Sequence, residues 1–397
     1  MKILLVNMSL DPVTGGGTAE RTLQLSLALA NAGQNCTVLT TNIGMTTERR
    51  SQIKNVRLLT LTCLCNRLYF FKFSLSQIRS EVNQSDVIHL MGHWTWINAL
   101  VYLLARHCKK PYAVCPAGAL PVFGRSKLIK KIYNAVIGRA IIRNAHFPVA
   151  IADNEVRHFV QYGVPASKVT LIPNGVNPDQ FTTDDLDILR MQTGLDNNPY
   201  ILFMGRLNCI KGPDLLLKAF LSISDRFPEV HLVFAGPDGG MLQNLMKQIS
   251  VYPEQGKRIH FIGHVAGKIK TAFYRSALLL VVPSRQEAMS IVALEAGVCG
   301  VPVLMTDQCG FGTLAHIGGG KVVSATKEAL SEGLVSLLEN RDNLPRMGER
   351  FKAYILEHFT WHTAAIAYID LFKKKGENLK SGPGNLNKPL SGKSATF

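Results

Sequence analysis

The stretch Pro283–Pro302, PSRQEAMSIVALEAGVCGVP, constrains the fold of this chain more than any other stretch. An apolar run, Ala277–Val282, comes before it and is typical of a buried strand that ends at Pro283. Ser290–Cys299 has the composition of a helix, because it is rich in Ala, Leu, Ile and Val and contains no proline. The pattern therefore predicts a buried strand, a loop and a helix, the unit from which open α/β sheets are built.

Two glutamates in this stretch suggest a ligand site. Glu287 falls in the expected loop, and Glu295 lies about 12 Å further along, roughly two turns into the expected helix. The unpaired N–H groups and the dipole at a helix N-terminus suit a phosphate, and carboxylates accept hydrogen bonds from sugar hydroxyls. A purely structural interpretation stays open, in which Glu287 caps the helix and Glu295 faces solvent.

Strands and helices alternate along the chain in two series, which at 397 residues fits two domains. The first series opens with a strand at Lys2–Asn7, a loop containing Gly15, Gly16 and Gly17, and a helix at Ala19–Ala32. The second opens with a strand at Tyr200–Met204. We expect the following parts: an N-terminal Rossmann-like domain (1–180), a polar linker (181–198), a C-terminal Rossmann-like domain (199–360), a last helix (361–375) and a disordered tail (376–397).

Ligands of open α/β sheets bind at the carboxyl ends of the strands, where two further residues stand out. Arg206 and Lys211 follow a strand and precede a helix, so both can bind a diphosphate, Arg by paired hydrogen bonds and Lys as a point charge. Together with Glu287 and Glu295 they predict a nucleotide-diphosphate site. The glycine loop lacks the GxGxxG pattern, which argues against a dinucleotide oxidoreductase.

The first 180 residues carry most of the positive charge, with 20 lysines and arginines against 8 acidic residues. In Leu64–Leu75 four aromatic residues are interleaved with Arg67 and Lys72, and the segment is interpreted either as a helix that buries its aromatic side chains or as a membrane-interface segment. Ser126–Asn144 is predicted to be a basic amphipathic helix, which either faces solvent or meets anionic lipid. No apolar stretch approaches the roughly 18 to 20 residues of a membrane span, and no nucleic-acid-binding module is evident.

Several motifs of the chain resemble those of a known family. GRLNCIKG, PSRQEAMSIVALEAGVCGVPV and IPNGVNPDQF are similar to motifs of the retaining glycosyltransferases of family 4 (glycosyltransferase group 1). The glycine loop and the loops MGHWTW (91–96) and PAGAL (116–120) resemble the polysaccharide and lipopolysaccharide branch of that family. The resemblance covers the chain up to about Lys374. It implies the GT-B fold, two Rossmann-like α/β domains that face each other across a cleft, with the last helix crossing back to the first domain.

The resemblance also implies roles for particular residues. Arg206 and Lys211 bind the donor diphosphate, Glu287 faces the donor sugar, and Glu295 holds the ribose. The backbone at the start of the helix binds phosphate, and the glycine loop lies beside it; these residues are Met289, Ser290 and Ile291, with Gly16 and Gly17. Family members transfer the sugar with retention and without a metal.

Two departures from the family pattern concern the catalytic site. Glu287-Ala288-Met289-Ser290 stands where the family often has Glu-Gly-Phe-Gly. No histidine occurs at Pro116–Gly118, where many members have one, and His93 is the candidate to replace it beside the acceptor. The alternative is that His93 is a loop histidine without a catalytic role.

The resulting prediction is a retaining, metal-independent hexosyltransferase of cell-surface polysaccharide biosynthesis. Its donor is a UDP- or GDP-linked sugar, it needs no further cofactor, and its acceptor is a glycan, expected to be lipid-linked. We expect it in the cytoplasm, at the inner face of a membrane if the basic first half binds lipid. Eight scattered cysteines without metal spacing fit a reducing compartment, and Asp185-Leu186-Asp187 is interpreted as chance because it lies in the polar linker. The alternative is a catalytically inactive nucleotide-sugar-binding protein of the same fold. The oligomeric state is left open.

Overall fold

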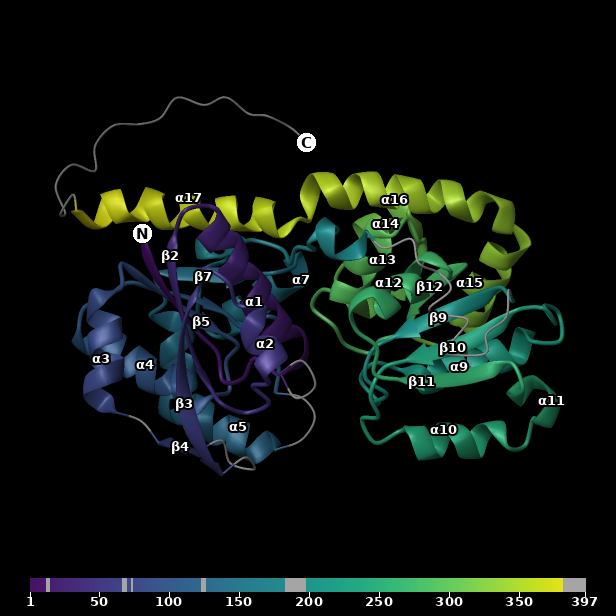
Figure 1. The fold of residues 1–397 in the computed structure, drawn as a ribbon, viewed down its shortest axis with the longest axis horizontal. Coiled ribbons are helices and arrows are strands. Elements are labelled where there is room, and N and C mark those ends of the chain that lie inside the picture. The colour runs from purple at the N-terminus through teal and green to yellow at the C-terminus, as the bar shows by residue number, and fades with distance from the viewer. Residues whose placement is uncertain (12–14, 66–69, 73, 123–125, 183–197, 381–397) are drawn as a thin grey trace.

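The structure is a computed structural model that describes residues 1–11, 15–65, 70–72, 74–122, 126–182 and 198–380. Within these ranges the strands form two separate sheets, which lie side by side in Figure 1. None of the helices in the described part of the chain combines the length and the apolar character that a membrane span requires. The expected division into two α/β halves is confirmed.

The N-terminal sheet has the strand order β4-β3-β2-β1-β5-β6-β7-β8. Every neighbouring pair is parallel except β3 and β4, which are antiparallel. Its strands are β1 (Lys2–Val6), β2 (Asn35–Thr41), β3 (Arg57–Cys65), β4 (Phe70–Lys72), β5 (Val87–Met91), β6 (Tyr112–Cys115), β7 (Phe147–Ala150) and β8 (Thr170–Leu171). Its helices are α1 (Gly16–Asn31), α2 (Thr47–Ser51), α3 (Leu75–Gln84), α4 (Trp96–His107), α5 (Lys127–Tyr133), the π-helical turn η1 (Asn134–Gly138), α6 (Arg139–Arg143), α7 (Asp153–Gln161) and the 3₁₀ turns η2 (Ala166–Lys168) and η3 (Pro178–Phe181).

The C-terminal sheet is parallel throughout, in the order β11-β10-β9-β12-β13-β14. Its strands are β9 (Tyr200–Met204), β10 (His231–Ala235), β11 (Ile259–Gly263), β12 (Leu279–Val282), β13 (Val303–Thr306) and β14 (Gly320–Val323). Its helices are α9 (Pro213–Ile223), α10 (Leu242–Ile249), α11 (Pro253–Gly256), α12 (Gly267–Arg275), α13 (Ile291–Val298), the turn η4 (Asp307–Cys309), α14 (Thr313–His316), α15 (Lys327–Glu339), the turn η5 (Arg341–Asn343), α16 (Leu344–His358) and α17 (Trp361–Lys380).

Continuous apolar runs explain why the central strands are buried on both faces. Every residue of β5, β9 and β12 is buried, as expected of parallel strands that have helices on both sides of the sheet. The predicted strand–loop–helix unit around Glu287 is confirmed as β12, the loop from Pro283 to Ser290, and α13. The loop containing Glu287 therefore follows the carboxyl end of β12, at the edge of the sheet.

One of the two interpretations of the aromatic segment near residue 70 is wrong. Phe70–Lys72 is strand β4, which pairs antiparallel with β3, so this segment is not a helix that buries aromatic side chains. The aromatic and β-branched content of the two strands favours an extended pairing at a sheet edge. Tyr69 and Phe73 lie outside the described residues.

The last helix returns to the N-terminal half. Figure 1 shows α16 over the C-terminal half and α17 continuing along the N-terminal half, where α17 packs on α1. At the crossing, Val176 N donates to Phe359 O at 2.8 Å and Trp361 N donates to Val176 O at 3.2 Å. The helix extends to Lys380, five residues beyond the expected Lys375, and no proline interrupts it between those positions. Residues 381–397 and most of the expected linker (183–197) lie outside the described residues.

A buried arginine joins α17 to the first half. Arg21 on α1 donates from Nη1 to Asn174 Oδ1 at 3.2 Å and from Nη2 to the Tyr368 hydroxyl of α17 at 2.7 Å. Both Arg21 and Tyr368 are buried, so these hydrogen bonds form away from water. This cluster ties α1, the loop before Gly175 and α17 into one packed unit.

Candidate functional site

Lys211 and Glu287 meet at the carboxyl edge of the C-terminal sheet. Lys211 Nζ lies 2.6 Å from Glu287 Oε1, and the other carboxylate oxygen accepts from Ser284 Oγ at 3.0 Å. The loops are fixed to each other by backbone bonds, from Arg285 N to Ile210 O at 2.7 Å and from Glu287 N to Gln308 O at 2.9 Å. The fold thus brings Lys211 and Glu287 together across 76 positions of sequence.

Gly212 sets the path of the Lys211 loop. Its φ of +68° lies in the left-handed region that favours glycine, and a Cβ atom there would overlap the carbonyl oxygen of Pro283. Gly212 then precedes Pro213, the first residue of α9. The close approach of the loop to Pro283 is what brings Lys211 to Glu287.

Replacing Gly212 with alanine should cost both stability and ligand binding. We expect the free energy of unfolding to fall by about 2 kcal/mol or more, because left-handed strain and a backbone overlap act together. Urea unfolding measures this loss. Gly267→Ala is the matched control, since Gly267 has a φ of +56° and open space around its Cβ position. Equal losses in the two variants would show that the overlap with Pro283 is unimportant.

Arg206 and the glycine loop approach each other from the two halves of the molecule. A Cβ atom on Gly16 would lie 3.7 Å from a terminal guanidinium nitrogen of Arg206. The stem of Arg206 packs against Gly239, where a Cβ atom would lie 2.8 Å from Arg206 Cγ. Arg206 thus belongs to the C-terminal half, and its guanidinium group reaches the glycine loop of the N-terminal half.

The start of α13 faces the same place. A Cβ atom on Gly17 would lie 3.6 Å from Cδ1 of Ile291, the first residue of α13. Met289 and Ser290 are buried, and within the described residues Ser290 Oγ has no hydrogen-bond partner. A buried hydroxyl without a partner is costly unless a ligand or water satisfies it. The N–H groups at this helix start and the Ser290 hydroxyl are therefore available for an anion.

Glu295 lies deeper than the loop residues. It is buried on α13, where Oε1 accepts from Lys270 Nζ at 2.6 Å and Oε2 accepts from the Tyr274 hydroxyl at 2.7 Å. Burial and the Glu295 carboxylate together raise the pKa of Tyr274 well above its usual range, so Tyr274 keeps its proton and donates a hydrogen bond to Glu295. Its alternative assignment as a solvated helix residue is wrong. A ribose hydroxyl would have to share Glu295 with Lys270 and Tyr274.

A second contact between the halves depends on Glu155, a residue that has no part in the sequence-based predictions. A Cβ atom on Gly118, in the PAGAL loop, would lie 2.9 Å from the Ala288 Cβ atom, next to Glu287. Gly118 N donates to buried Glu155 Oε1, and Glu155 Oε2 accepts from Ile151 N at 2.8 Å. Burial raises the pKa of the Glu155 carboxyl, while the two amides oppose that shift. Glu155 thus orients the loop that touches the Glu287 segment; an acidic residue in an Ala-Asp-Asn-Glu run carries no motif that would have revealed it.

His93 is placed apart from the charged residues of the site. Its side chain is 2% exposed and packs edge-on against Trp94, Tyr133 and Tyr162. Nε2 lies 3.1 Å from Asn134 Oδ1, and Nδ1 has no hydrogen-bond partner in the described part of the chain. Burial lowers the pKa of His93 to about 4. The structure thus places a neutral imidazole within an aromatic cluster and does not bring it to Lys211 or Glu287.

The buried histidines predict acid lability. A neutral histidine with a pKa lowered in the folded state stabilises the fold above its unfolded pKa of about 6.5, and this stability is lost as the pH falls toward the folded pKa. For His93 the window runs from pH 6.5 down to about 4, at about 1.4 kcal/mol per pH unit. Urea unfolding of His93→Gln at several pH values should show a correspondingly shallower loss. His107→Gln, at an exposed position, controls for removing an imidazole, and equal slopes in wild type and His93→Gln would contradict the prediction.

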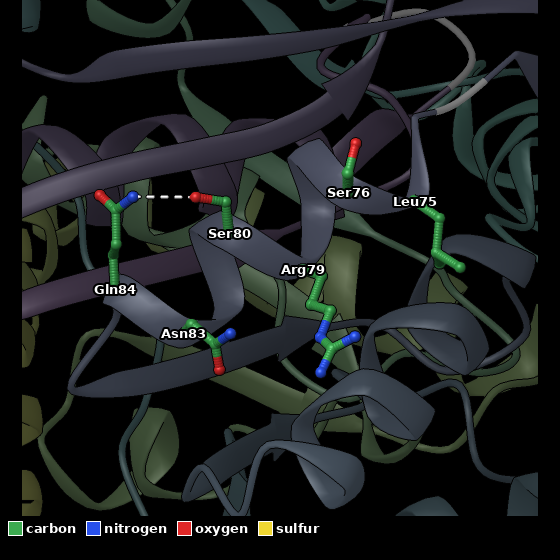
Figure 2. A pocket seen from close by; sticks show the side chains of 6 residues that line it. All are labelled: Leu75, Ser76, Arg79, Ser80, Asn83 and Gln84. Atoms are coloured by element: carbon green, nitrogen blue, oxygen red, sulfur yellow. Dashed lines mark hydrogen bonds between the residues drawn. The ribbon is translucent and has the colours of Figure 1, made fainter.

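A hollow on the outer face of α3 is unrelated to these residues. Figure 2 shows its lining, which comes from one helix: Leu75, Ser76, Arg79, Ser80, Asn83 and Gln84. Gln84 Nε2 donates to Ser80 Oγ at 2.9 Å within it. No residue of the predicted site lines this hollow, so the two are separate.

Across the ranges that the structure describes, no group of three or more His, Cys, Asp or Glu side chains is placed to hold a metal ion. Asp185 and Asp187 lie outside those ranges. The polar groups described at the site are the Glu287 carboxylate, the cations of Arg206 and Lys211, two serine hydroxyls (Ser284 and Ser290) and the N–H groups at the start of α13. This set suits an anionic ligand that carries hydroxyl groups.

Comparison with known proteins gives the family. Residues 15–180 match the family model described as Glycosyltransferase Family 4, and residues 187–354 match Glycosyl transferases group 1. The D-inositol 3-phosphate glycosyltransferase of Nocardia farcinica is 30% identical over 311 residues, which are 74% of this chain and 68% of that protein. The enzyme of the same name from Gordonia bronchialis is 27% identical over 323 residues, 76% of this chain and 69% of that protein.

Solved structures show the same fold. Anabaena HepE, crystallised with UDP and glucose, superposes with a TM-score of 0.76 at 18% identity, over 96% of this chain and 100% of that one. WaaG, a glycosyltransferase involved in lipopolysaccharide biosynthesis, superposes with a TM-score of 0.67 at 18% identity, over 93% of this chain and 99% of that one. The relative at 30% identity and the two matched models, which cover both halves, agree with the motifs around Arg206 and Glu287. The chain belongs to the family 4 (group 1) glycosyltransferases, retaining GT-B enzymes that transfer a hexose-type sugar from a nucleotide donor.

Proposed function

We propose that this enzyme transfers a hexose-type sugar from a UDP- or GDP-linked donor to a glycan acceptor in cell-surface polysaccharide biosynthesis. The observation that carries the proposal is the meeting of Lys211, Glu287 and the unpartnered Ser290 hydroxyl at the start of α13. The glycine loop of the other half approaches the same point through Gly16 and Gly17. A diphosphate and a sugar ring have the charges and hydroxyl groups that these residues bind.

The cations, the neutral donors and the carboxylate of the site have different proposed roles. Arg206 and Lys211 would bind the diphosphate and stabilise the negative charge that grows on it as the glycosidic bond breaks. The helix N–H groups and the Ser290 hydroxyl would add neutral donors to the same oxygens. Glu287, held by Lys211 and Ser284, would accept hydrogen bonds from the donor sugar. Two cations and a helix start supply the charge that a metal ion supplies elsewhere, so we propose a metal-independent reaction.

Glu295 is proposed to bind the ribose. Lys270 and Tyr274 hold its carboxylate in place, which supports a fixed acceptor for ribose hydroxyls. His93 is proposed to act only through the loop that carries it, because its imidazole is buried. The acceptor is proposed to bind against the N-terminal half, beside the loops at 91–96 and 116–120, one of which touches Ala288.

The acceptor is proposed to be a lipid-linked glycan, used at the cytoplasmic face of a membrane. Support comes from the positive charge of the first 180 residues and from the structural likeness to WaaG. The name of the D-inositol 3-phosphate glycosyltransferases among the relatives indicates that those enzymes act on a small soluble acceptor. The N-terminal half is expected to bind the acceptor, so its residues would determine whether a lipid-linked or a soluble acceptor is used.

Product analysis tests the proposal. The enzyme is incubated with UDP- and GDP-sugars and with lipid-linked or soluble glycan acceptors, and the nucleoside diphosphate and the glycosylated product are measured. We expect release of the nucleoside diphosphate, and a product with the anomeric configuration of the donor. A protein that binds the donor but never turns it over with any acceptor or water would be the inactive nucleotide-sugar-binding protein instead.

A further inference from the structure

The helical segment from α5 through η1 exposes a row of large apolar side chains to solvent. Leu128, Ile129, Ile132 and Val136 are between 55% and 77% exposed. They follow one another at spacings of one, three and four residues, so they share one side of the helix. We call these four residues the α5 ridge. Isolated exposed apolar residues are normal, but a contiguous row of four indicates a binding surface.

Positive charge surrounds the α5 ridge. Lys127 and Lys131 are exposed on α5 and Arg139 is exposed on α6. Between Asp86 and Asp153 the chain has no acidic residue and nine lysines and arginines. Trp96, at the start of α4, is half exposed beside the helix and contacts Tyr133 with a ring-centroid distance of 6.1 Å. Exposed apolar side chains, cations and a half-exposed tryptophan thus occur together on and beside this helical segment.

The combination of exposed apolar side chains and cations distinguishes between the possible binding partners of the α5 ridge. A second copy of the chain would present the same cations, and like charges would repel across the contact. A nucleic acid would use the lysines but would leave Leu128, Ile129 and Val136 exposed to water. The surface of an anionic bilayer uses both, since acyl chains receive the apolar side chains and headgroup phosphates receive the lysines.

We propose that the α5 ridge and its surrounding cations dock the enzyme on an anionic lipid membrane. The inference rests on the proposed function in that a lipid-linked acceptor would be presented at the same surface. Figure 1 shows α5 on the side of the N-terminal half opposite to α17, so the docked surface does not involve the returning helix.

The buried side of the same helix holds an acceptor-side loop. The Tyr133 hydroxyl lies 3.0 Å from His93 O and 3.1 Å from Thr95 O, and Asn134 Oδ1 lies 3.1 Å from His93 Nε2. Trp94 Nε1 in turn donates to Ala119 O of the PAGAL loop at 2.5 Å. A membrane that seats the α5 ridge therefore seats the loops at 91–96 and 116–120 at a fixed depth relative to the lipid. This gives the buried aromatic cluster around His93 a positioning role.

Vesicle binding of the full chain tests the docking without any substrate. Sedimentation with vesicles of phosphatidylglycerol and phosphatidylcholine is compared with sedimentation with phosphatidylcholine alone, at low and high salt. We expect binding to the anionic vesicles that weakens at high salt. Ile129→Ser with Val136→Ser should raise the lipid concentration for half-binding at least about tenfold, and Lys127→Gln with Lys131→Gln by about thirtyfold. Met246→Ser with Val251→Ser, at exposed apolar positions of the C-terminal half, is the matched control.

Several results would overturn the proposal. They are absence of binding to anionic vesicles, equal binding by the ridge variants and wild type, or a change of oligomeric state in the ridge variants, which would show that a second copy covers the ridge. Nucleotide binding, measured in the same preparations by thermal shift, is independent of the ridge. A protein that binds vesicles but no nucleotide would contradict the proposed function alone, and one that binds nucleotide but no vesicles would contradict the docking alone.

Discussion

Replacing Lys211 with alanine lowers the rate of sugar transfer by on the order of 10²- to 10³-fold. The side chain does two things in this site. It supplies a cation where the diphosphate leaves, and it holds the Glu287 carboxylate at 2.6 Å in the position proposed for contact with the donor sugar. Without Lys211, one oxygen of the half-buried carboxylate loses its charged partner and only the bond from Ser284 remains. Initial rates with saturating donor measure the effect.

Two variants separate charge from general damage. Lys211→Arg keeps a cation at the site and should retain part of the activity, though a planar guanidinium does not reproduce the position of an ammonium group. Lys218→Ala removes an exposed lysine from α9, the helix that follows Lys211, and should leave the rate almost unchanged. Wild-type activity in Lys211→Ala would exclude the proposed diphosphate site.

Replacing Arg21 with alanine lowers the free energy of unfolding by about 3–5 kcal/mol, which is the second large effect expected. The change leaves the Tyr368 hydroxyl and Asn174 Oδ1 without their buried donor and opens a cavity between α1 and α17. It also removes the cation whose field favours the charged form of buried Glu155, the residue that orients the Gly118 loop. Urea unfolding gives the loss in stability.

Tyr368→Phe is the graded control for this cluster. It removes one hydroxyl and one of the two hydrogen bonds made by Arg21, so it should cost about 1 kcal/mol and leave the helix packing intact. Equal effects of Tyr368→Phe and Arg21→Ala would mean that the guanidinium contributes only through Tyr368. A negligible effect of Arg21→Ala would show that α17 is held to the first half by apolar packing alone.

The parts of the fold with a strong local pattern could be predicted from the sequence. β9 has the bounds that its apolar run indicates, β1 ends one residue before the predicted Asn7, and α1 ends one residue before the predicted Ala32. Short elements were harder, because few residues leave little pattern. β14 (Gly320–Val323) was not identified, and the expected alternative of a helix near residue 70 is a paired edge strand whose partner lies in β3. Pairing between strands is a tertiary contact, which local periodicity does not contain.

The candidate site could also be predicted only in part from the sequence. Arg206, Lys211 and Glu287 lie in strand-end loops, and parallel sheets bring such loops to one edge, so their proximity followed from the topology. Glu155, Lys270 and Tyr274 hold the Gly118 loop and the Glu295 carboxylate, but they come from helices with no motif. The burial of His93 was also hidden, because it depends on Tyr133, Asn134 and Tyr162 packing over the loop.

A thermal-shift screen with UDP, GDP, ADP and their common sugars, repeated on Lys211→Ala, tests the central claim most directly. A ligand at 100 times its Kd stabilises the folded state by about 2.7 kcal/mol, which corresponds to a shift of several degrees. We predict a shift with one nucleotide series in the wild-type protein and none with that series in Lys211→Ala, which identifies the donor base. No shift with any nucleotide, or an equal shift in both proteins, would contradict a donor site built on Lys211 and Glu287.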